Sequence, residues 1–350
     1  MVGNRIEQYR VLPTSAIVSF LKTCIATLSI ARLEIDRASK REREIMQDDL
    51  FELALRQPFD TEQNAMEWFV SHRWPDGVRC ARCDGSRVHE TDYHPSQPYR
   101  CSDCKRYFSV KTGTIMQSSK LPLRTWALAI CLLMDSKCGI NSYDLARLLR
   151  VTQPTAWTLT HKIRKGFEDD DGSLFRGPVE VDETYVGGRA RNQPLERKKR
   201  LKKRVVIGML DRDTDKVRFK LIAGASRPLL CRFIYENTED WIEVYTDEHK
   251  GYQRMRRRKH STVNHSKGER GLTNRIESEW AVFKRGIRAV YLQMSPKHQP
   301  RYLVEYQERR NLKLLTMLEK MQTFLRRSIG KRLRYLDLIA GGPAYPPVKR

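Results

Sequence analysis

Val179-Glu-Val-Asp-Glu-Thr-Tyr-Val-Gly-Gly188 is the stretch from which the rest of the chain is best interpreted. Its valines and Tyr185 favour a short β-strand that ends at the two glycines. Three acids, Glu180, Asp182 and Glu183, stand inside this strand, although acidic residues are poor strand formers. A conflict between the secondary-structure preference of single residues and the hydrophobic pattern of the segment is typical of functional sites. An exposed edge strand whose carboxylates face water is the alternative that this stretch alone leaves open.

The composition indicates a protein that binds polyanions. The chain has 350 residues, enough for two or three domains with cores of their own. It carries 66 Lys and Arg against 42 Asp and Glu, a formal net charge of +24. Charge of this sign favours contact with nucleic-acid phosphates. A cationic protein that is merely soluble is the alternative, and the clustering of the basic residues makes it the weaker one.

The cysteines and the hydropathy indicate where the protein works. Two close pairs and four scattered cysteines suit a reducing compartment better than a disulfide framework. The one long apolar run, Ala16 to Leu33, contains Lys22 and Arg32 and is a poor membrane span. No small-residue cleavage site clearly follows it, so a signal peptide is not predicted either. We therefore expect a cytoplasmic, nucleoid-associated protein. The eight cysteines are Cys24, Cys80, Cys83, Cys101, Cys104, Cys131, Cys138 and Cys231.

Residues 1–58 are the least informative part of the chain. An amphipathic segment leads into a mixed-charge stretch, Arg37 to Glu44, that is compatible with a solvated helix. We interpret this arm as dispensable and Met46 as a candidate natural start of translation. Full activity of a chain that begins at Met46 would support this interpretation.

Residues 59–118 carry a cysteine pattern that predicts a zinc ribbon. Cys80, Cys83, Cys101 and Cys104 are spaced C-x2-C-x17-C-x2-C, as in four-cysteine zinc sites. We expect Gly85 to permit the tight backbone of the first cysteine turn. A redox dithiol is the alternative, but it does not need two matched pairs. His89 and His94 lie between the pairs and are interpreted as surface residues rather than ligands.

Residues 119–172 are helical by pattern and end in an acidic linker. The helices expected at Ser142–Leu149 and at 154–164, with a tight turn between them, resemble a helix-turn-helix. Many α-hairpins look alike, so a plain hairpin remains the alternative. Cys131 and Cys138 follow the apolar helical repeat that includes Trp126, and are predicted to be core or near-core thiols rather than ligands. The residues predicted to contact DNA are Thr155, Thr158, His161 and Lys162.

Residues 173–311 alternate strands and helices. After the acidic strand comes a basic loop, residues 189–204, with nine Lys or Arg and a single acid. No core can bury that density, so the loop either stays solvated or contacts phosphate, as we predict for Arg197, Lys198, Lys199 and Arg200. The remaining elements are expected at 205–210, 217–222 and 241–247 as strands and around 229–235 as a helix.

The last motif is a helix expected at Asn274–Ile287. At about 100° per residue, Glu277 and Lys284 share one flank of this helix and Glu279 lies on the other. A purely structural alternative exists, because Asn274 as N-cap would place Glu277 where it closes a capping box. Residues 312–350 form a basic C-terminal helix and tail.

The order of these elements is that of an α/β domain. It can bring Asp182 and Asp247 together on neighbouring strands, with Glu277 reaching in from a helix. Carboxylates gathered without His or Cys suit Mg²⁺ or Mn²⁺ rather than zinc. Two such ions can activate an attacking oxygen and stabilise the leaving oxygen of a phosphodiester. The chemistry alone therefore indicates metal-dependent cleavage or transfer of DNA strands.

Several motifs together resemble the bacterial insertion-sequence DDE transposases of the ISXO-two-like group. The resemblance covers roughly 59–311 and implies a zinc ribbon before an RNase H-like catalytic domain. In this chain the helix-turn-helix-like region lies between the two. The motifs are the opening stretch, Val244-Tyr-Thr-Asp247, Asn264-His-Ser266 with Glu269, Ile276-Glu-Ser278 with Trp280, Lys284-Arg-Gly286 and Ser295-Pro-Lys-His298.

The resemblance implies a role for each acid. Asp182 and Asp247 correspond to the first two catalytic acids and magnesium ligands. The third position in the group is Glu or Asn followed by Lys, which selects Glu277 with Lys284 seven residues later; Asn274 and then Glu279 are the alternates. Within the opening strand, Glu183 is interpreted as a neighbour of the metal and Glu180 as structural. Two departures, Leu272 where related sequences often show His and the unusually dense basic loop, leave the three acids intact.

The implied function is a transposase that binds terminal inverted repeats and catalyses strand cleavage and strand transfer. Its expected partners are double-stranded DNA, as element ends and target, and a second copy of the chain on the paired ends. Two alternatives stay open. One is a non-catalytic regulator that uses the zinc ribbon and the helix-turn-helix. The other is a structure-specific nuclease of the RNase H-like fold that cleaves branched DNA.

Overall fold

The computed structural model describes residues 58–340 except 95, 137, 170–171, 187–203, 253–254, 256–258, 264–272 and 293. From Glu62 onward the chain forms one compact unit. The predicted dispensable arm, the start at Met46, and the basic-loop residues Arg197, Lys198, Lys199 and Arg200 lie outside the described residues. None of the described helices is both long and apolar enough to cross a membrane.

The cysteine-rich region folds as a helix and a small sheet. Helix α3 (Glu62–Arg73) precedes strands β1 (Val88–Glu90), β2 (Tyr99–Cys101) and β3 (Tyr107–Phe108), which pair antiparallel in the order β1-β2-β3. Its core combines two of the cysteines with aromatic rings, since Phe108 and Tyr99 pack with Cys80 and Cys101. A core this small needs an additional constraint to be stable.

Helices α4 (Leu123–Asp135), α5 (Ser142–Leu149) and α6 (Gln153–Phe167) follow, and the C-terminal helices α11 (Met317–Ser328) and α12 (Tyr335–Ile339) complete the described part of the chain. α4 is apolar on most sides and packs against α3, α5, α6, α11 and α10 (Gln299–Asn311). Cys131 is buried and its Sγ lies 3.7 Å from the sulfur of Met321 on α11, which confirms the prediction of a core thiol. Its neighbour in that prediction, Cys138, is only partly buried.

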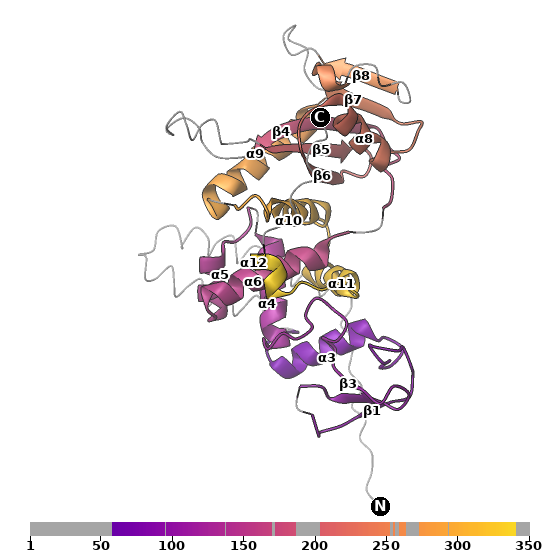
Figure 1. Ribbon diagram of the computed structural model, residues 1–350, viewed down its shortest axis with the longest axis vertical. Helices are drawn as coiled ribbons and strands as arrows, with labels where there is room; N and C mark the ends of the chain where they lie inside the picture. Colours follow the sequence, from indigo (N-terminus) through magenta and orange to yellow (C-terminus); the bar gives the residue numbers. More distant parts are fainter. Residues whose placement is uncertain are drawn as a thin grey trace, which may run out of the picture. The chain divides into compact units, whose positions relative to one another are not determined.

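A five-stranded mixed sheet carries the opening stretch (Figure 1). Its strands are β4 (Val179–Val186), β5 (Arg204–Asp211), β6 (Val217–Ile222), β7 (Glu243–Asp247) and β8 (Lys259–Val263), in the order β6-β5-β4-β7-β8. β4, β5 and β6 pair antiparallel, whereas β4–β7 and β7–β8 pair parallel. β4 is thus the middle strand, and the alternative of an exposed edge strand is wrong.

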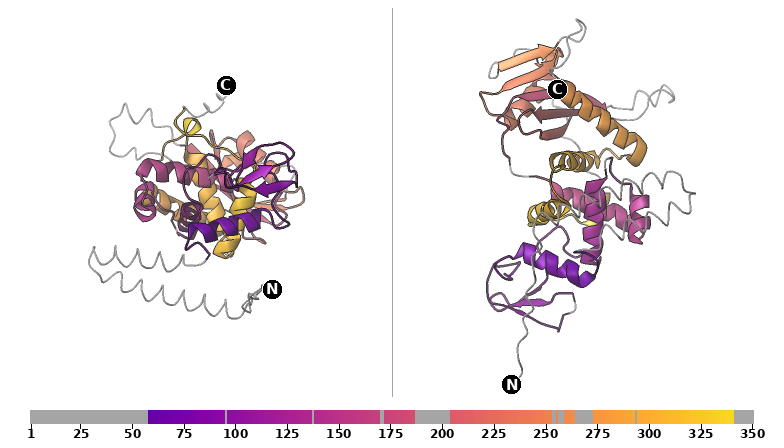
Figure 2. Two further views of the ribbon diagram at one scale, coloured as in Figure 1. Left: turned by 90° about the horizontal axis from the view of Figure 1, so that it is seen from below. Right: turned by 180° about the vertical axis from the view of Figure 1, so that it is seen from behind.

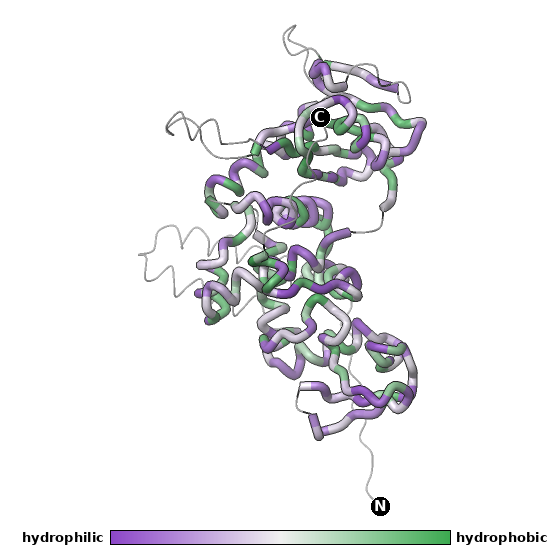
Figure 3. The backbone as a smooth tube through the Cα atoms, viewed as in Figure 1, coloured by the Kyte–Doolittle hydropathy of each residue, from purple (hydrophilic) through white to green (hydrophobic). Residues whose placement is uncertain are grey.

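Helices cover both faces of this sheet. Alternate residues of β4, Val179 and Val181, pack with β5 and with α8 (Arg227–Asn237) on one face. The other face packs against α9 (Asn274–Gly286) and α10 (Gln299–Asn311), as the views in Figure 2 also show. Burial on both sides explains why β5 is apolar along nearly its whole length. Figure 3 shows this contrast, with hydrophobic residues in the middle strands and a largely hydrophilic β8.

Three details differ from the predictions. The parallel strand β8 was not expected, because its sequence Lys-His-Ser-Thr-Val alternates weakly and is mostly polar. The N-cap of α9 is Thr273, so Asn274 is the first helical residue, and the capping box that was the structural alternative for Glu277 does not form. The helix also ends at Gly286 and passes into a π-helical turn, η4 (Ile287–Tyr291). The predicted strands at 205–210, 217–222 and 241–247 and the helix around 229–235 correspond to β5, β6, β7 and α8.

Candidate active site and metal centre

Asp182 lies in the middle strand, on the face that α9 covers. It pairs with Gly208 of β5, and the indole of Trp280 from α9 fills the space that this glycine leaves. A Cβ added at Gly208 would stand 2.6 Å from the Trp280 ring. The Nε1–H of Trp280 donates to Oδ2 of Asp182 at 2.9 Å. The carboxylate of Asp182 is therefore held in one orientation by a helix that is distant in sequence.

Asp247 is the last residue of β7, the parallel neighbour of β4. The register pairs Val179 with Val244 and Glu180 with Tyr245, an offset of 65 residues. Continuing the same offset sets Asp182 beside 182 + 65 = Asp247, on the same face of the sheet. The carboxyl end of parallel strands is where ligand sites of α/β sheets usually form. The prediction that the two strands bring these acids together thus agrees with the register.

The electrostatics of Asp182 are those of a crowded carboxylate. Burial first, and then the negative charges of Glu183 and Asp247, raise the pKa of Asp182 to about 7. Hydrogen bonds from the backbone of Glu183 and from Trp280 act in the opposite direction. A buried acid beside like charges is stabilised by a proton or by a cation. The site therefore has the donor type and the charge that a hard divalent cation requires.

Glu277 lies in the first turn of α9, three residues before Trp280 and therefore about 60° from it around the helix. Its side chain is exposed, and its Oε1 accepts a hydrogen bond from the Thr273 hydroxyl at 2.7 Å. Within the described residues, Asp182, Asp247 and Glu277 do not have their ligand oxygens all within 4.8 Å of one another.

The two alternates for the third acid differ in their surroundings. Glu279 accepts from Arg310 Nε at 2.6 Å and from the Tyr306 hydroxyl at 2.8 Å, both on α10. Its charge is thus already used to join two helices. Asn274 is exposed at the start of α9. Lys284 is partly buried and lines a shallow groove on the outer side of the helix with Ala281, Arg285, Arg288 and Ala289.

The four predicted zinc ligands come together. Their sulfur atoms all lie within 4.8 Å of one another, with Cys80–Cys104 and Cys83–Cys101 each 3.7 Å apart. A tetrahedral ion with metal–sulfur distances of about 2.3 Å requires sulfur–sulfur distances of about 3.8 Å. The group therefore fits Zn²⁺. It is the single group of three or more potential metal ligands within this distance among the residues described.

The two cysteine turns share a residue with positive φ, but this residue is not Gly85, which was predicted to permit the tight backbone. The residues after the second cysteine of each pair, Asp84 and Lys105, take positive φ of 58° and 59°. Gly85 does not take a positive φ, and a Cβ there would meet the end of the Asp103 side chain. His89 is exposed and His94 packs against Tyr107, so neither belongs to the cysteine group.

The predicted DNA-contacting residues of α6 do not all reach the surface. Thr155, Thr158 and Lys162 are partly exposed. His161 is 0% exposed and packs against His298 and against the ring of Tyr302. Its assignment as a DNA contact is therefore wrong, because α10 and the segment before it cover this side of α6.

Contacts that the sequence did not indicate complete the site. Glu180 and Glu183 are both bound by distant partners, and Tyr252 reaches Glu183 from the η2 turn (Lys250–Tyr252). Nothing in the local sequence around Tyr252 signals this contact. Trp280 could be recognised as a core residue from its helical spacing, but not as a donor to Asp182.

Comparison with known proteins agrees with this organisation. Residues 175–311 match the ISXO2-like transposase domain, and residues 60–107 match the transposase zinc-ribbon domain. The chain is also similar to an uncharacterised protein in the transposable element ISH50 of Halobacterium salinarum. The two are 28% identical over 209 residues, which is 55% of this chain and 70% of the relative.

Proposed function

The chain belongs to the insertion-sequence transposases that combine a transposase zinc ribbon with an ISXO2-like transposase domain, and from this premise we propose what it does. It binds the terminal inverted repeats of its own element and catalyses metal-dependent strand cleavage and strand transfer. The observation that carries this proposal is the parallel pairing of β4 with β7, whose offset of 65 residues, when continued, brings Asp182 in the middle of β4 level with Asp247 at the end of β7.

The fold of the catalytic part is, in this proposal, RNase H-like. Three antiparallel strands followed by two parallel ones, with the first strand in the middle, support this assignment. Helices on both faces support it as well. The proposed domains are a zinc ribbon at 59–118, a helical region at 119–172, the catalytic domain at 173–311 and a basic C-terminal segment at 312–350.

The proposed cation ligands are Asp182, Asp247 and Glu277. A bound Mg²⁺ or Mn²⁺ would supply positive charge to the oxygens around the reacting phosphorus. Trp280 orients the carboxylate of Asp182 through its 2.9 Å hydrogen bond. Glu277 ranks above Glu279 because Arg310 and Tyr306 already bind Glu279. Asn274 remains the alternate for the third ligand, and a variant at this position would test it.

The proposed DNA contacts come from two parts of the chain. α5 and α6 are joined by a tight turn in which Arg150 takes a positive φ of 53°, and this geometry supports a helix-turn-helix. Thr155, Thr158 and Lys162 remain available on α6. Lys284 and Arg285 on α9, with Arg288 on η4, are further proposed contacts to DNA phosphates, since they line one groove.

The experiment uses the purified chain, Mg²⁺ and a duplex that ends in the inverted repeats flanking its gene. We expect cleavage at the element end followed by joining to target DNA, most simply by two copies on paired ends. Asp182→Asn should abolish cleavage and leave end binding unchanged. If Asp182→Asn cleaves like the wild type, the assignment of the site fails. Binding without cleavage by the wild type would favour a regulator, and cleavage of branched DNA without inverted repeats would favour a nuclease.

A further inference from the structure

We propose that the two other acids of β4, Glu180 and Glu183, are positioning residues for the second and third catalytic acids. Glu180 fixes the helix that carries Glu277, and Glu183 fixes the turn that follows Asp247. This inference rests on the proposed function of Asp182, Asp247 and Glu277. In this proposal β4 carries the first acid and anchors the two elements that hold the other two acids.

Glu180 caps α9 from outside that helix. Its carboxylate is 0% exposed, and its Oε2 accepts from the backbone N–H of Arg275 at 3.0 Å and of Ile276 at 3.1 Å. These are the second and third residues of α9, whose N–H groups have no partner inside a helix. Thr273, the N-cap, makes no side-chain capping bond. A negative charge at a helix N-terminus is also favourable to the helix dipole.

The charge of Glu180 is balanced on the side away from the helix. Arg212 Nε donates to its Oε1 at 2.9 Å, and the guanidinium of Arg212 lies 4.0 Å from the ring centroid of Tyr245. Tyr245 is the register partner of Glu180 on β7. A buried ion pair is seldom the most stable choice for a core position, because apolar residues of similar size are often as stable or more so. The retained charge is better explained by the placement of α9.

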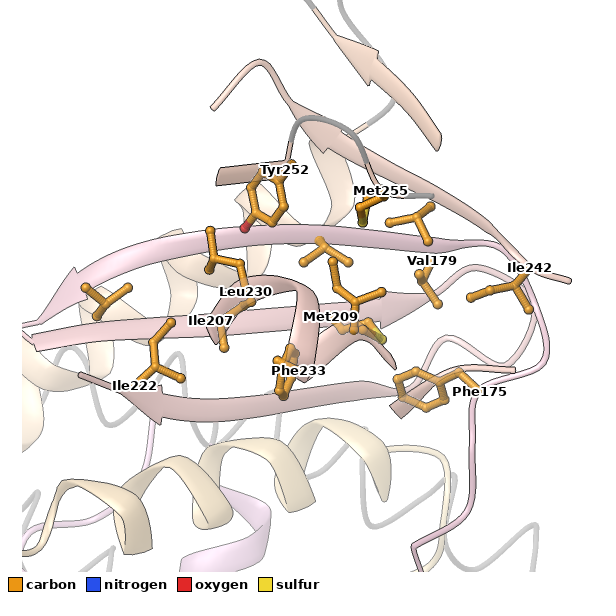
Figure 4. Packing of buried hydrophobic residues seen from close by; sticks show 14 residues of the cluster. Phe175, Val179, Ile207, Met209, Ile222, Leu230, Phe233, Ile242, Tyr252 and Met255 are labelled. Atoms are coloured by element: carbon orange, nitrogen blue, oxygen red, sulfur yellow. The ribbon is translucent and has the colours of Figure 1, made fainter. Parts of the chain in front are cut away.

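Glu183 points to the opposite face of β4. Its side chain is 7% exposed, and its Oε2 accepts from the hydroxyl of Tyr252 at 2.6 Å. Its Oε1 lies 3.6 Å from Nδ1 of His249. Tyr252 is fully buried among the core side chains beside β4, with its hydroxyl directed at that strand (Figure 4). The far end of the turn is thus anchored to the strand of Asp182.

The turn that contains His249 and Tyr252 also orients Asp247. The backbone N–H of His249 donates to Oδ1 of Asp247 at 3.0 Å, and the N–H of Tyr252 donates to the His249 carbonyl at 2.9 Å. A short chain of contacts therefore runs from Glu183 through Tyr252 and His249 to the carboxylate of Asp247. Loss of the Tyr252 hydroxyl would loosen this carboxylate without emptying the core, since the ring itself stays.

The test of the Glu183 contact is a double-mutant cycle in the full chain. Glu183→Leu, which removes the acceptor of the Tyr252 hydroxyl, Tyr252→Phe and the double variant are compared for Mn²⁺ binding by calorimetry, for the Mn²⁺ dependence of end cleavage and for end binding. Partners that orient metal ligands typically change metal affinity about tenfold or more. We expect each single variant to weaken Mn²⁺ binding roughly tenfold, the double variant to be no worse than either, and end binding to be unchanged.

The test of the Glu180 contact compares Glu180→Gln with Glu180→Ala. Gln keeps an oxygen that can accept from the helix, so it should retain most of the Mn²⁺ affinity, whereas Ala should lose roughly tenfold or more. Amide exchange at Arg275 and Ile276 should rise in the Ala variant. The matched control is Glu236→Gln, which removes an exposed carboxylate paired with Lys220 and Arg232 and should behave as wild type.

Three results would overturn the inference. The first is Mn²⁺ binding by the variants that equals that of the wild type. The second is that the effects of Glu183→Leu and Tyr252→Phe on Mn²⁺ affinity multiply independently. The third is a loss of end binding in proportion to the loss of Mn²⁺ binding, which would indicate a merely structural role. A wild-type chain that binds Mn²⁺ but never cleaves would instead contradict the proposed function. In that case the calorimetry and the amide exchange still decide the positioning roles.

Discussion

The indole N–H of Trp280 donates to Oδ2 of Asp182 across 98 residues of sequence. The ring can lie there because Gly208, the strand partner of Asp182, has no side chain. One helix thus supplies both an orienting donor for the first proposed acid and, one turn earlier, the third. The arrangement makes several measurable predictions.

Replacing Trp280 with Phe keeps an aromatic ring against the sheet and removes the donor. A hydrogen bond to a charged group contributes about 1.5–3 kcal/mol, so loss of the bond should slow end cleavage by roughly tenfold to a hundredfold. End binding should not change, because Trp280 lies in the core of the domain. Single-turnover cleavage at saturating Mg²⁺ measures the effect. Equal rates in the two proteins would show that the bond does not orient Asp182.

Gly208→Ala should destabilise the domain. The new Cβ would stand 2.6 Å from the Trp280 ring and 2.8 Å from Phe219, so rings must shift in a packed core. Overpacking of this kind costs about 1–3 kcal/mol. Thermal unfolding provides the measurement. Gly224→Ala is the matched control, because no atom lies within 4 Å of a Cβ at that position.

The raised pKa of Asp182 predicts a pH-dependent stability. Its pKa is about 7 in the folded chain and about 4 when unfolded, so the folded chain binds the extra proton between these values. The contribution of Asp182 to the free energy of unfolding is then greatest at low pH and is lost as the pH rises from 4 through 7. Without added divalent cation, Asp182→Asn should raise the melting temperature at pH 8, and its advantage should narrow toward pH 4.

Added Mn²⁺ reverses this order. A cation that binds only the folded state stabilises it, so Mn²⁺ should raise the melting temperature of the wild type and leave that of Asp182→Asn nearly unchanged. A wild-type chain insensitive to Mn²⁺ at pH 8 would argue against a cation at this carboxylate.

The zinc ribbon should depend on its ion. We expect a single zinc ion per chain and its release when a strong chelator is added in excess. Because structural zinc contributes directly to folding, Cys101→Ser should lose the ion and the ordered ribbon. End binding should fall with it, while the five-stranded sheet stays folded. Zinc content and circular dichroism measure the loss of the ion and of the ordered ribbon. Unchanged end binding by zinc-free protein would show that the ribbon does not take part in recognising the element ends.

His161 should make the helical region sensitive to acid. Burial first, and then the positive charges of Arg164, His298 and Arg301, hold the pKa of His161 far below its usual range. Below about pH 6.5 the unfolded chain binds a proton at this histidine and the folded chain does not. The contribution of His161 to the free energy of unfolding is therefore present above pH 6.5 and is lost as the pH falls. His161→Phe should therefore lose less stability between pH 7 and pH 5 than the wild type. His89→Gln, an exposed control, should follow the wild type.

Much of the fold could be predicted from local sequence. The zinc ligands follow from spacing, and β4, β5 and β6 follow from β-branched runs separated by turn residues. The position of Asp247 beside Asp182 follows from one strand with an acid in its middle and a second strand that ends in an acid. These features depend on residues close together in the chain.

What could not be predicted depends on distant contacts. β8 is polar and becomes a strand because β7 offers it a parallel edge. His161 is in a helix with basic and polar neighbours, yet α10 buries it. Glu180 caps a helix that begins 94 residues later in sequence, since 274 − 180 = 94. No periodicity or spacing in the sequence records such partners.

The measurement that tests the central claim most directly is a metal switch at Asp182. A cysteine thiolate is a softer ligand than a carboxylate and binds Mg²⁺ poorly, whereas Mn²⁺ accepts it more readily. If Asp182 holds the catalytic cation, Asp182→Cys should not cleave element ends in Mg²⁺ and should regain cleavage in Mn²⁺, while Asp182→Ala stays inactive in both. Cleavage by Asp182→Ala in Mg²⁺ at the wild-type rate would contradict the account.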